Sequence, residues 1–254
     1  MSKRPRKKTQ ADFEAIVENQ IALGKRFLWL LIVPFVISAV LLFMVVTMSS
    51  RLTDVEVVTK QLTIERLLAQ DHNLALAVNQ YEQIARTRET APILARLGIL
   101  YFMLDSKKND QIAIKTLERA KDVDPEYWET YRYLNFIYAS NDQAEKAIAV
   151  GEKGLKLNEY DSMVFNNLAW VYATFKEPFQ NLPRARQYAE RALELTNGRN
   201  REVLDTLAEI YFREGGPEKQ KLAREFLRKA IAIAPNGNTS HLDHFKKLFP
   251  DEKP

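Results

Sequence analysis

The chain has 254 residues, of which 46% are hydrophobic and 28% are charged, and it contains no cysteine. The missing cysteine excludes disulfides, thiolate nucleophiles and thiolate metal sites. Residues 1–26 hold seven Lys/Arg and three Asp/Glu side chains, which account for the whole net charge of +4. The remaining residues have no net charge, and this argues against a nucleic-acid-binding surface.

The first predicted elements are a basic cytoplasmic tail at residues 1–26 and a membrane span. Residues 27–48 contain no charged side chain over 22 positions. A helix of this length is about 33 Å long and crosses a hydrocarbon core of about 30 Å. The run also exceeds the roughly 7–15 apolar residues of a signal peptide. We therefore predict one transmembrane helix, and Lys25 and Arg26 at its edge favour an N-terminus inside.

The structure of the tail remains open between two alternatives. Phe13, Ile16, Val17 and Ile21 recur at helical spacing, which favours a short amphipathic helix on the cytoplasmic face of the membrane. The density of basic side chains favours a disordered tail instead.

Beyond the span, one spacing recurs in four segments, residues 94–101, 131–138, 165–172 and 204–211. In each segment a large residue is followed three positions later by Leu, then by a small or polar residue, and finally by Tyr. Each of these segments is followed by a second helical segment, in which small side chains recur at helical spacing. Ala185, Ala189 and Ala192 are an example. Small residues on one face of a helix allow close packing of helices.

This pattern resembles the tetratricopeptide repeat (TPR), a helix–turn–helix unit of about 34 residues. The resemblance implies an all-α superhelix in which stacked units share a continuous core. Its expected parts are a linker with a degenerate capping repeat at 49–90, four units in 91–237 (91–127, 128–161, 162–200 and 201–237), and a C-terminal capping helix with a tail at 238–254.

The resemblance also implies which side chains line the concave surface of the superhelix. The expected positions are Ile99, Phe102, Met103, Arg132, Phe136, Asn166, Trp170, Asp205, Glu209 and Phe212. Two interpretations remain open for these residues. They form a groove that binds a polypeptide, or they pack against the second helices of neighbouring units. The predicted helix that contains Asn166 and Trp170 also has an opposite face, which is expected to lie in the core. The residues on that face are Phe165, Leu168, Ala169 and Tyr172.

Gly151 and Gly154 stand in a second helix, where larger residues are usual in this repeat. Each glycine costs about 1 kcal/mol relative to alanine in a helix interior. Close approach of helices is one explanation, and a softer hinge or an open pocket is the other.

The sequence shows no constellation of residues for catalysis or for a cofactor. His241 and His244 have a spacing that can contact a metal, but no third ligand lies nearby. No glycine-rich phosphate loop and no nucleophile–base arrangement stands out. We therefore expect neither an enzyme nor a metal, cofactor or small-molecule site.

Taken together, the chain resembles membrane-tethered TPR proteins of bacteria. The resemblance implies a single-pass protein of the bacterial cytoplasmic (inner) membrane whose repeats lie in the periplasm. The expected function is that of an adaptor or scaffold, which binds a polypeptide partner and assists the assembly or secretion of envelope proteins. The alternative is a stoichiometric accessory subunit of a larger membrane protein complex.

Overall fold

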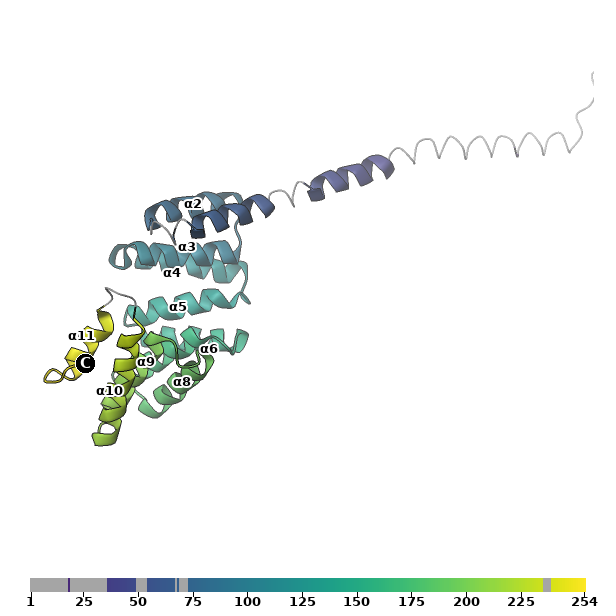
Figure 1. Ribbon diagram of the computed structural model, residues 1–254. Helices are drawn as coiled ribbons and strands as arrows, with labels where there is room; N and C mark the ends of the chain where they lie inside the picture. The colour runs from purple at the N-terminus through teal and green to yellow at the C-terminus, as the bar shows by residue number, and fades with distance from the viewer. Residues whose placement is uncertain (1–17, 19–35, 49–53, 67, 69–72, 235–238) are drawn as a thin grey trace, which may run out of the picture. The chain divides into compact units, whose positions relative to one another are not determined.

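The computed structural model describes residues 18, 36–48, 54–66, 68, 73–234 and 239–254 (Figure 1). The chain divides into two compact units, residues 1–63 and residues 64–254. All regular secondary structure in the described residues is helical. The prediction of an all-α chain is confirmed for this part of the sequence.

The first unit contains a helix at residues 36–48. Its large apolar side chains are exposed around the whole circumference, among them Leu42, Phe43 and Val45. Residues 27–35 of the predicted span lie outside the described residues, as do the apolar side chains of the predicted amphipathic tail. Among the described residues, no helix combines the length and the hydropathy that crossing a membrane requires.

The second unit is an array of helices that follow one another in pairs. Helix α2 (Leu74–Thr87) precedes the first pair. The pairs are α3 (Ala91–Leu104) with α4 (Ser106–Val123), α5 (Trp128–Ser140) with α6 (Ala144–Leu157), α7 (Ser162–Thr174) with α8 (Leu182–Leu195), and α9 (Arg201–Glu214) with α10 (Pro217–Ala232). Helix α11 (Ser240–Leu248) follows the last pair. Below, the members of each pair are called its first and second helix.

Short polar side chains fix where several of these helices begin. Asp105, Asp161, Asn181 and Asn200 each accept hydrogen bonds from backbone N–H groups in the first turn of α4, α7, α8 and α9, respectively. The first N–H groups of a helix have no partner within the helix, so such caps stabilise its start.

The core repeats from pair to pair. The second helices contribute side chains that are fully buried, such as Ala113, Leu117 and Ala120 in α4. The first helices contribute Leu134, Leu168 and Leu207, of which none is more than 1% exposed. Ala169 and Tyr172 are buried as expected. Phe165 is only partly buried, and its ring packs against Tyr188 with the ring centroids 5.8 Å apart.

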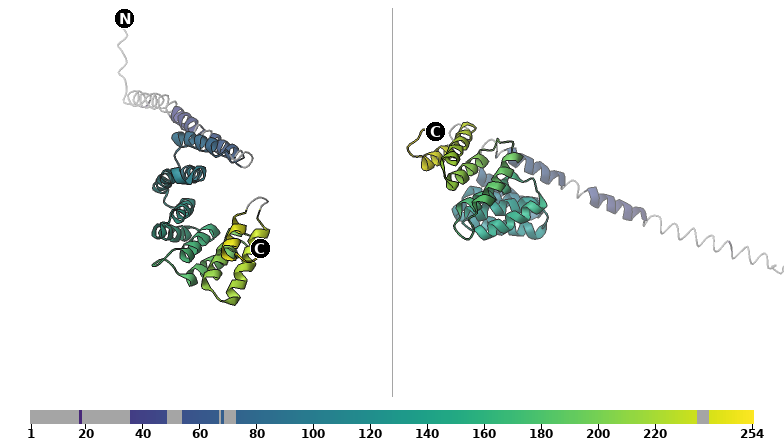
Figure 2. Two further views of the ribbon diagram at one scale, coloured as in Figure 1. Left: turned by 90° about the vertical axis from the view of Figure 1, so that its left-hand side faces the viewer. Right: turned by 90° about the horizontal axis from the view of Figure 1, so that it is seen from below.

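Neighbouring pairs pack through their first helices, α3 against α5, α5 against α7, and α7 against α9. Each second helix also packs on the first helix that follows it. Figure 2 (left) shows the pairs following one another along a curve. The side of the first helices that faces away from the second helices is called the inner face below, and it is marked by Met103, Phe136, Asn166 and Trp170.

Close packing explains the two glycines of α6. A Cβ atom added at Gly151 would lie 2.7 Å from Nδ2 of Asn135 and 2.8 Å from Cδ2 of Leu168. A Cβ atom added at Gly154 would lie 3.1 Å from Cβ of Tyr131. Asn135 is fully buried, and its amide donates a hydrogen bond of 2.9 Å to a backbone carbonyl of α6. The close approach of α5 and α7 to α6, rather than a hinge or a pocket, accounts for both positions.

Candidate functional site

The N-terminal half of the inner face carries an exposed apolar patch, formed by Phe102, Met103 and Phe136. Met103 is 54% exposed and Phe136 is 37% exposed. The ring of Phe102 meets the ring of Phe136 edge-on, with the centroids 5.6 Å apart. Helices α3 and α5 therefore present one shared apolar surface, which we call the apolar patch.

Ile99 does not contribute to this surface, and the sequence expectation is wrong for this residue. Its side chain is only 6% exposed. Helix α3 packs against α2, α4 and α5, so three neighbours cover it and most of its apolar side chains are buried. The repeat position predicted an exposed side chain, but the neighbouring helices close over it.

Arg132 is held within the array and does not face an open groove. Its Nε donates a hydrogen bond to Oδ2 of Asp161 (2.8 Å), and its guanidinium lies 4.2 Å from the centroid of the Trp128 ring. Nη1 of Arg132 lies 3.5 Å from Glu129. The other carboxylate oxygen of Asp161 caps α7. Arg132 therefore joins α5 to the start of α7, and these contacts occupy the guanidinium that was expected to line the concave surface.

Asn166 and Trp170 are both partly buried on α7. Oδ1 of Asn166 is buried and has no hydrogen-bond partner within the described residues. A buried acceptor without a partner costs about 1–3 kcal/mol. The ring of Trp170 meets the ring of His244 edge-on, with the centroids 6.4 Å apart. Helix α11 therefore covers one side of Trp170.

The C-terminal half of the inner face is occupied by α11. Nδ1 of His244 lies 2.8 Å from Oδ1 of Asp205, and Nε2 lies 2.9 Å from Oε2 of Glu209. Glu209 is 5% exposed and also accepts a hydrogen bond from Arg213. Nδ1 of His241 lies 3.2 Å from the same oxygen of Asp205. Asp205 and Glu209 were expected to face a groove, and instead they bind a helix of their own chain.

Aromatic packing holds the same helix in place. Phe245 and Phe249 are buried and pack against α9 and α10. The ring of Phe212 meets the ring of Phe249 edge-on, with the centroids 5.4 Å apart. The capping helix expected from the sequence thus covers the last pair, and Phe212 lies beneath it rather than on a free surface.

The two carboxylates control the protonation of His244. Burial of the imidazole acts to lower its pKa, but the hydrogen bonds and charges of Asp205 and Glu209 outweigh burial and raise the pKa of His244 to about 9. For Glu209, burial acts to raise the pKa, but the hydrogen bonds from His244 and Arg213 outweigh it and lower the pKa. At neutral pH the network is therefore an imidazolium between two carboxylates.

We expect the array to lose stability as the pH rises toward 9. Protonated His244 contributes its full stability below the ordinary histidine pKa of 6.5 and loses it as the pH rises through the folded pKa of about 9. The loss is at most about 3.5 kcal/mol, because each pH unit between the two pKa values corresponds to about 1.4 kcal/mol. Urea unfolding at about pH 6 and about pH 9.5 measures it. A His244→Gln chain should lack this part of the pH dependence, and an equal dependence in both chains would contradict the assignment.

The role of the histidine pair was missed at the level of the sequence, although a signal was present. Asp205 and Glu209 are spaced four residues apart on a first helix, and His241 and His244 are spaced three apart on the cap. Each pair therefore lies on one face of its helix. Among the described residues, no group of three or more His, Asp or Glu side chains is placed to hold a metal ion.

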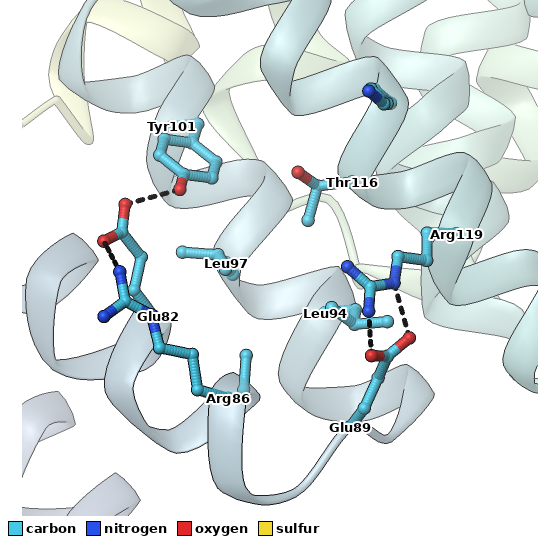
Figure 3. Close-up of a pocket in the computed structure, with 10 residues that line it drawn as sticks. Glu82, Arg86, Glu89, Leu94, Leu97, Tyr101, Thr116 and Arg119 are labelled. Carbon is cyan, nitrogen blue, oxygen red and sulfur yellow. Dashed lines mark hydrogen bonds and ion pairs between the residues drawn. The ribbon is translucent and has the colours of Figure 1, made fainter.

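A separate cavity of about 460 Å³ lies between α2, α3 and α4 (Figure 3). Leu97 lies between two charged walls of this cavity. On one wall Tyr101 donates a hydrogen bond of 2.6 Å to Glu82, and on the other Arg119 forms an ion pair with Glu89. Burial and the neighbouring Glu82 raise the pKa of Tyr101 to about 12. None of these residues was expected from the sequence to line a cavity, because the cavity forms where the degenerate repeat meets the first complete pair.

No family model and no curated protein matches the chain. Matches are found among solved structures. A thermophilic TPR protein of Thermus thermophilus superposes with a TM-score of 0.59 at 19% sequence identity, over 76% of this chain and 96% of that chain. PilF of Pseudomonas aeruginosa superposes with a TM-score of 0.57 at 16% identity, over 76% of this chain and 93% of that chain.

The chain has a TPR-like fold. A third match, the Cut9–Hcn1 hetero-tetramer of APC/C, has a TM-score of 0.60 at 20% identity and covers 72% of this chain. This chain spans about a third of that one, 34% of its length. At these identities the likeness establishes the fold of the TPR-like array and not its activity. The all-α, TPR-like superhelix expected from the sequence is thereby confirmed.

Proposed function

We propose that this chain is a membrane-tethered scaffold that binds a polypeptide through the inner face of its TPR-like array. The observation that carries the proposal is the apolar patch, where Phe102, Met103 and Phe136 form one surface across two helices. Apolar side chains that gather on the surface of a well-packed domain mark interaction sites. Because α11 covers the C-terminal half of the inner face, we assign the binding surface to α3 and α5.

The chemistry of the apolar patch suits side chains of a protein partner. An aromatic ring such as Phe136 supplies a rigid anchor, and the flexible thioether of Met103 adapts to the shape of the partner. One structural neighbour is a member of a hetero-tetramer. This supports the view that an array of this kind can serve in protein assembly.

We also propose that the helix at 36–48 belongs to a membrane anchor at 27–48, with the N-terminus in the cytoplasm. Apolar side chains exposed around a whole helix suit a lipid environment. Lys25 and Arg26 precede the apolar run, as the positive-inside rule requires for this orientation. The array then lies in the periplasm of a bacterial cell, where it assists the assembly or secretion of envelope proteins.

Protease treatment tests this topology. Added to the outside of an intact cytoplasmic membrane, a protease should digest the TPR-like array and leave the basic tail, since the tail lies on the protected side. Immunoblots against each end of the chain measure the outcome. Digestion of the tail with protection of the array would reverse the orientation, and release of the chain into the soluble fraction would rule out the anchor.

Binding through the apolar patch is tested at position 136. A photoreactive side chain placed there should cross-link a polypeptide in intact membranes, and mass spectrometry identifies it. Phe136→Ala should then raise the Kd for that partner by at least about 30-fold, because loss of a central aromatic anchor costs about 2 kcal/mol or more. Titration calorimetry with the full chain in detergent measures the Kd.

Leu222→Ala is the matched control for Phe136→Ala. Leu222 is exposed to the same extent, 37%, but lies on the second helix α10. It should leave the Kd unchanged. Equal losses from both substitutions would refute binding at the inner face. Isolation of the chain in a fixed ratio with other membrane proteins would assign it as an accessory subunit instead.

A further inference from the structure

We propose that the C-terminal half of the inner face is a recognition surface for a helix, and that α11 is its intramolecular occupant. A partner helix with the same side-chain pattern binds there by replacing α11. This inference rests on the proposed function, because it treats the inner face as the binding side of the array. It adds the chemical class of the partner, which the contacts of α11 specify.

The first requirement on an occupant is a cationic side chain. The two ring nitrogens of His244 lie 2.8 Å and 2.9 Å from Asp205 and Glu209. The ring of Trp170 lies beside the same imidazole. Two carboxylates next to an aromatic ring favour a cation that donates hydrogen bonds. A His, Arg or Lys residue at this point of a partner helix satisfies the site.

The second requirement is a pair of aromatic side chains. Phe245 directly follows the cation and is fully buried, and Phe249 lies four residues further on. The guanidinium of Arg224 lies 4.5 Å from the centroid of the Phe249 ring. The surface of α9 and α10 is therefore shaped for an aromatic residue next to the cation and for another one turn later.

The third requirement is an acidic group beyond the helix. Nε of Arg224 donates a hydrogen bond of 2.9 Å to Oε1 of Glu252, and Nη2 lies 2.7 Å from the same oxygen. The site thus presents carboxylates on α9 and a guanidinium on α10. An occupant with a basic residue in the middle of its helix and an acidic residue after the second aromatic matches both charges, and this order fixes its direction along the site.

The size of α11 makes its replacement feasible. The helix has nine residues, and isolated helices of this length are marginal in water. Its docking therefore depends on the side-chain contacts just described. An empty site would expose the apolar surface beneath Phe245, so an occupant must bring an aromatic of its own. Because α11 is tethered to its site, it competes at a high effective concentration, and a partner gains access once this docking is weakened.

A labelled synthetic peptide with the sequence of residues 239–254 tests the proposal on the full chain. Lys246→Pro breaks α11 within the chain, since proline lacks the backbone N–H and clashes with the preceding turn. Lys246→Ala keeps the helix, and the side chain of Lys246 is exposed. Measured by fluorescence anisotropy, the peptide should bind the Lys246→Pro chain at least about tenfold more tightly than the wild type or Lys246→Ala, because the tethered competitor is removed.

A second substitution tests the receptor side. Glu209→Gln in the Lys246→Pro chain should cancel the gain in affinity. Equal peptide affinity in the wild type and the Lys246→Pro chain would overturn the proposal, and so would a gain that survives Glu209→Gln. The proposal would also be overturned if the Lys246→Pro chain lost its entire helical circular dichroism signal at a lower temperature than the wild type. In that case α11 would be an inseparable part of the fold.

The outcome is separable from that of the proposed function. Phe136→Ala, placed in the Lys246→Pro chain, should leave the peptide affinity unchanged because Phe136 lies in the other half of the inner face. If the photoreactive side chain at position 136 cross-links no polypeptide, binding at the apolar patch is refuted, but the role of α11 is not affected. Failure of the peptide to bind refutes the role of α11 alone.

Discussion

Replacing Leu168 by alanine should lower the free energy of unfolding of the array by about 2–5 kcal/mol. Leu168 is fully buried in α7, and its side chain approaches the position that Gly151 leaves open on α6. Truncation removes buried apolar atoms and leaves a cavity between helices that are already closely packed. Urea unfolding of the full chain in detergent, followed by far-ultraviolet circular dichroism, measures the loss.

Leu76→Ala is the control for this substitution. Leu76 lies on α2 and is 42% exposed. The same chemical change there should alter the free energy of unfolding by less than about 0.5 kcal/mol. Similar losses at Leu76 and Leu168 would contradict the packing of α7 against α6.

Asp161→Ala should cost about 3 kcal/mol or more. One oxygen of Asp161 accepts hydrogen bonds from the backbone N–H groups of Met163 and Val164, and the other accepts Nε of Arg132. The side chains of Asp161 and Arg132 are 2% and 18% exposed. Removing one member of a buried ion pair costs about 3–5 kcal/mol, while a lost helix cap costs about 0.5–2 kcal/mol. In the variant, Glu129 still pairs with Arg132. We therefore expect the loss of stability to lie near the lower end of the sum of these two ranges.

Two further variants separate the cap from the ion pair. Asp161→Asn keeps an oxygen that can cap α7 and removes the negative charge, so it should cost less than Asp161→Ala. Arg132→Met combined with Asp161→Asn should cost less than the two single changes added together, because the pair couples them. Additive losses would show that the ion pair contributes nothing, and a loss below about 1 kcal/mol for Asp161→Ala would contradict both roles.

The fold was predictable from the sequence because its signal is local. The first helices need Leu and Tyr at fixed spacing, and the second helices need small residues where they cross their partners. Ala185, Ala189 and Ala192 illustrate the second rule, since all three are fully buried in α8. No long-range information was needed to find this pattern.

The binding surface was predictable only in part, because exposure depends on which neighbour covers a residue. Met103 and Phe136 are exposed, since nothing in the described array lies over them. Ile99 occupies a repeat position of the same kind but is closed in by three helices. Glu209 is covered by α11, and the repeat pattern does not contain the information that a terminal helix folds back onto the inner face.

The pairing of neighbours has a consequence for how the chain acquires its structure. The main packing contacts join helices that are one or two places apart in the sequence. Such a low contact order permits fast folding, since no distant segments must first be brought together. Folding of a stacked array can also begin in any pair and spread to the next. Each pair can therefore pack onto its predecessor while the rest of the chain is still being synthesised, and α11 joins last.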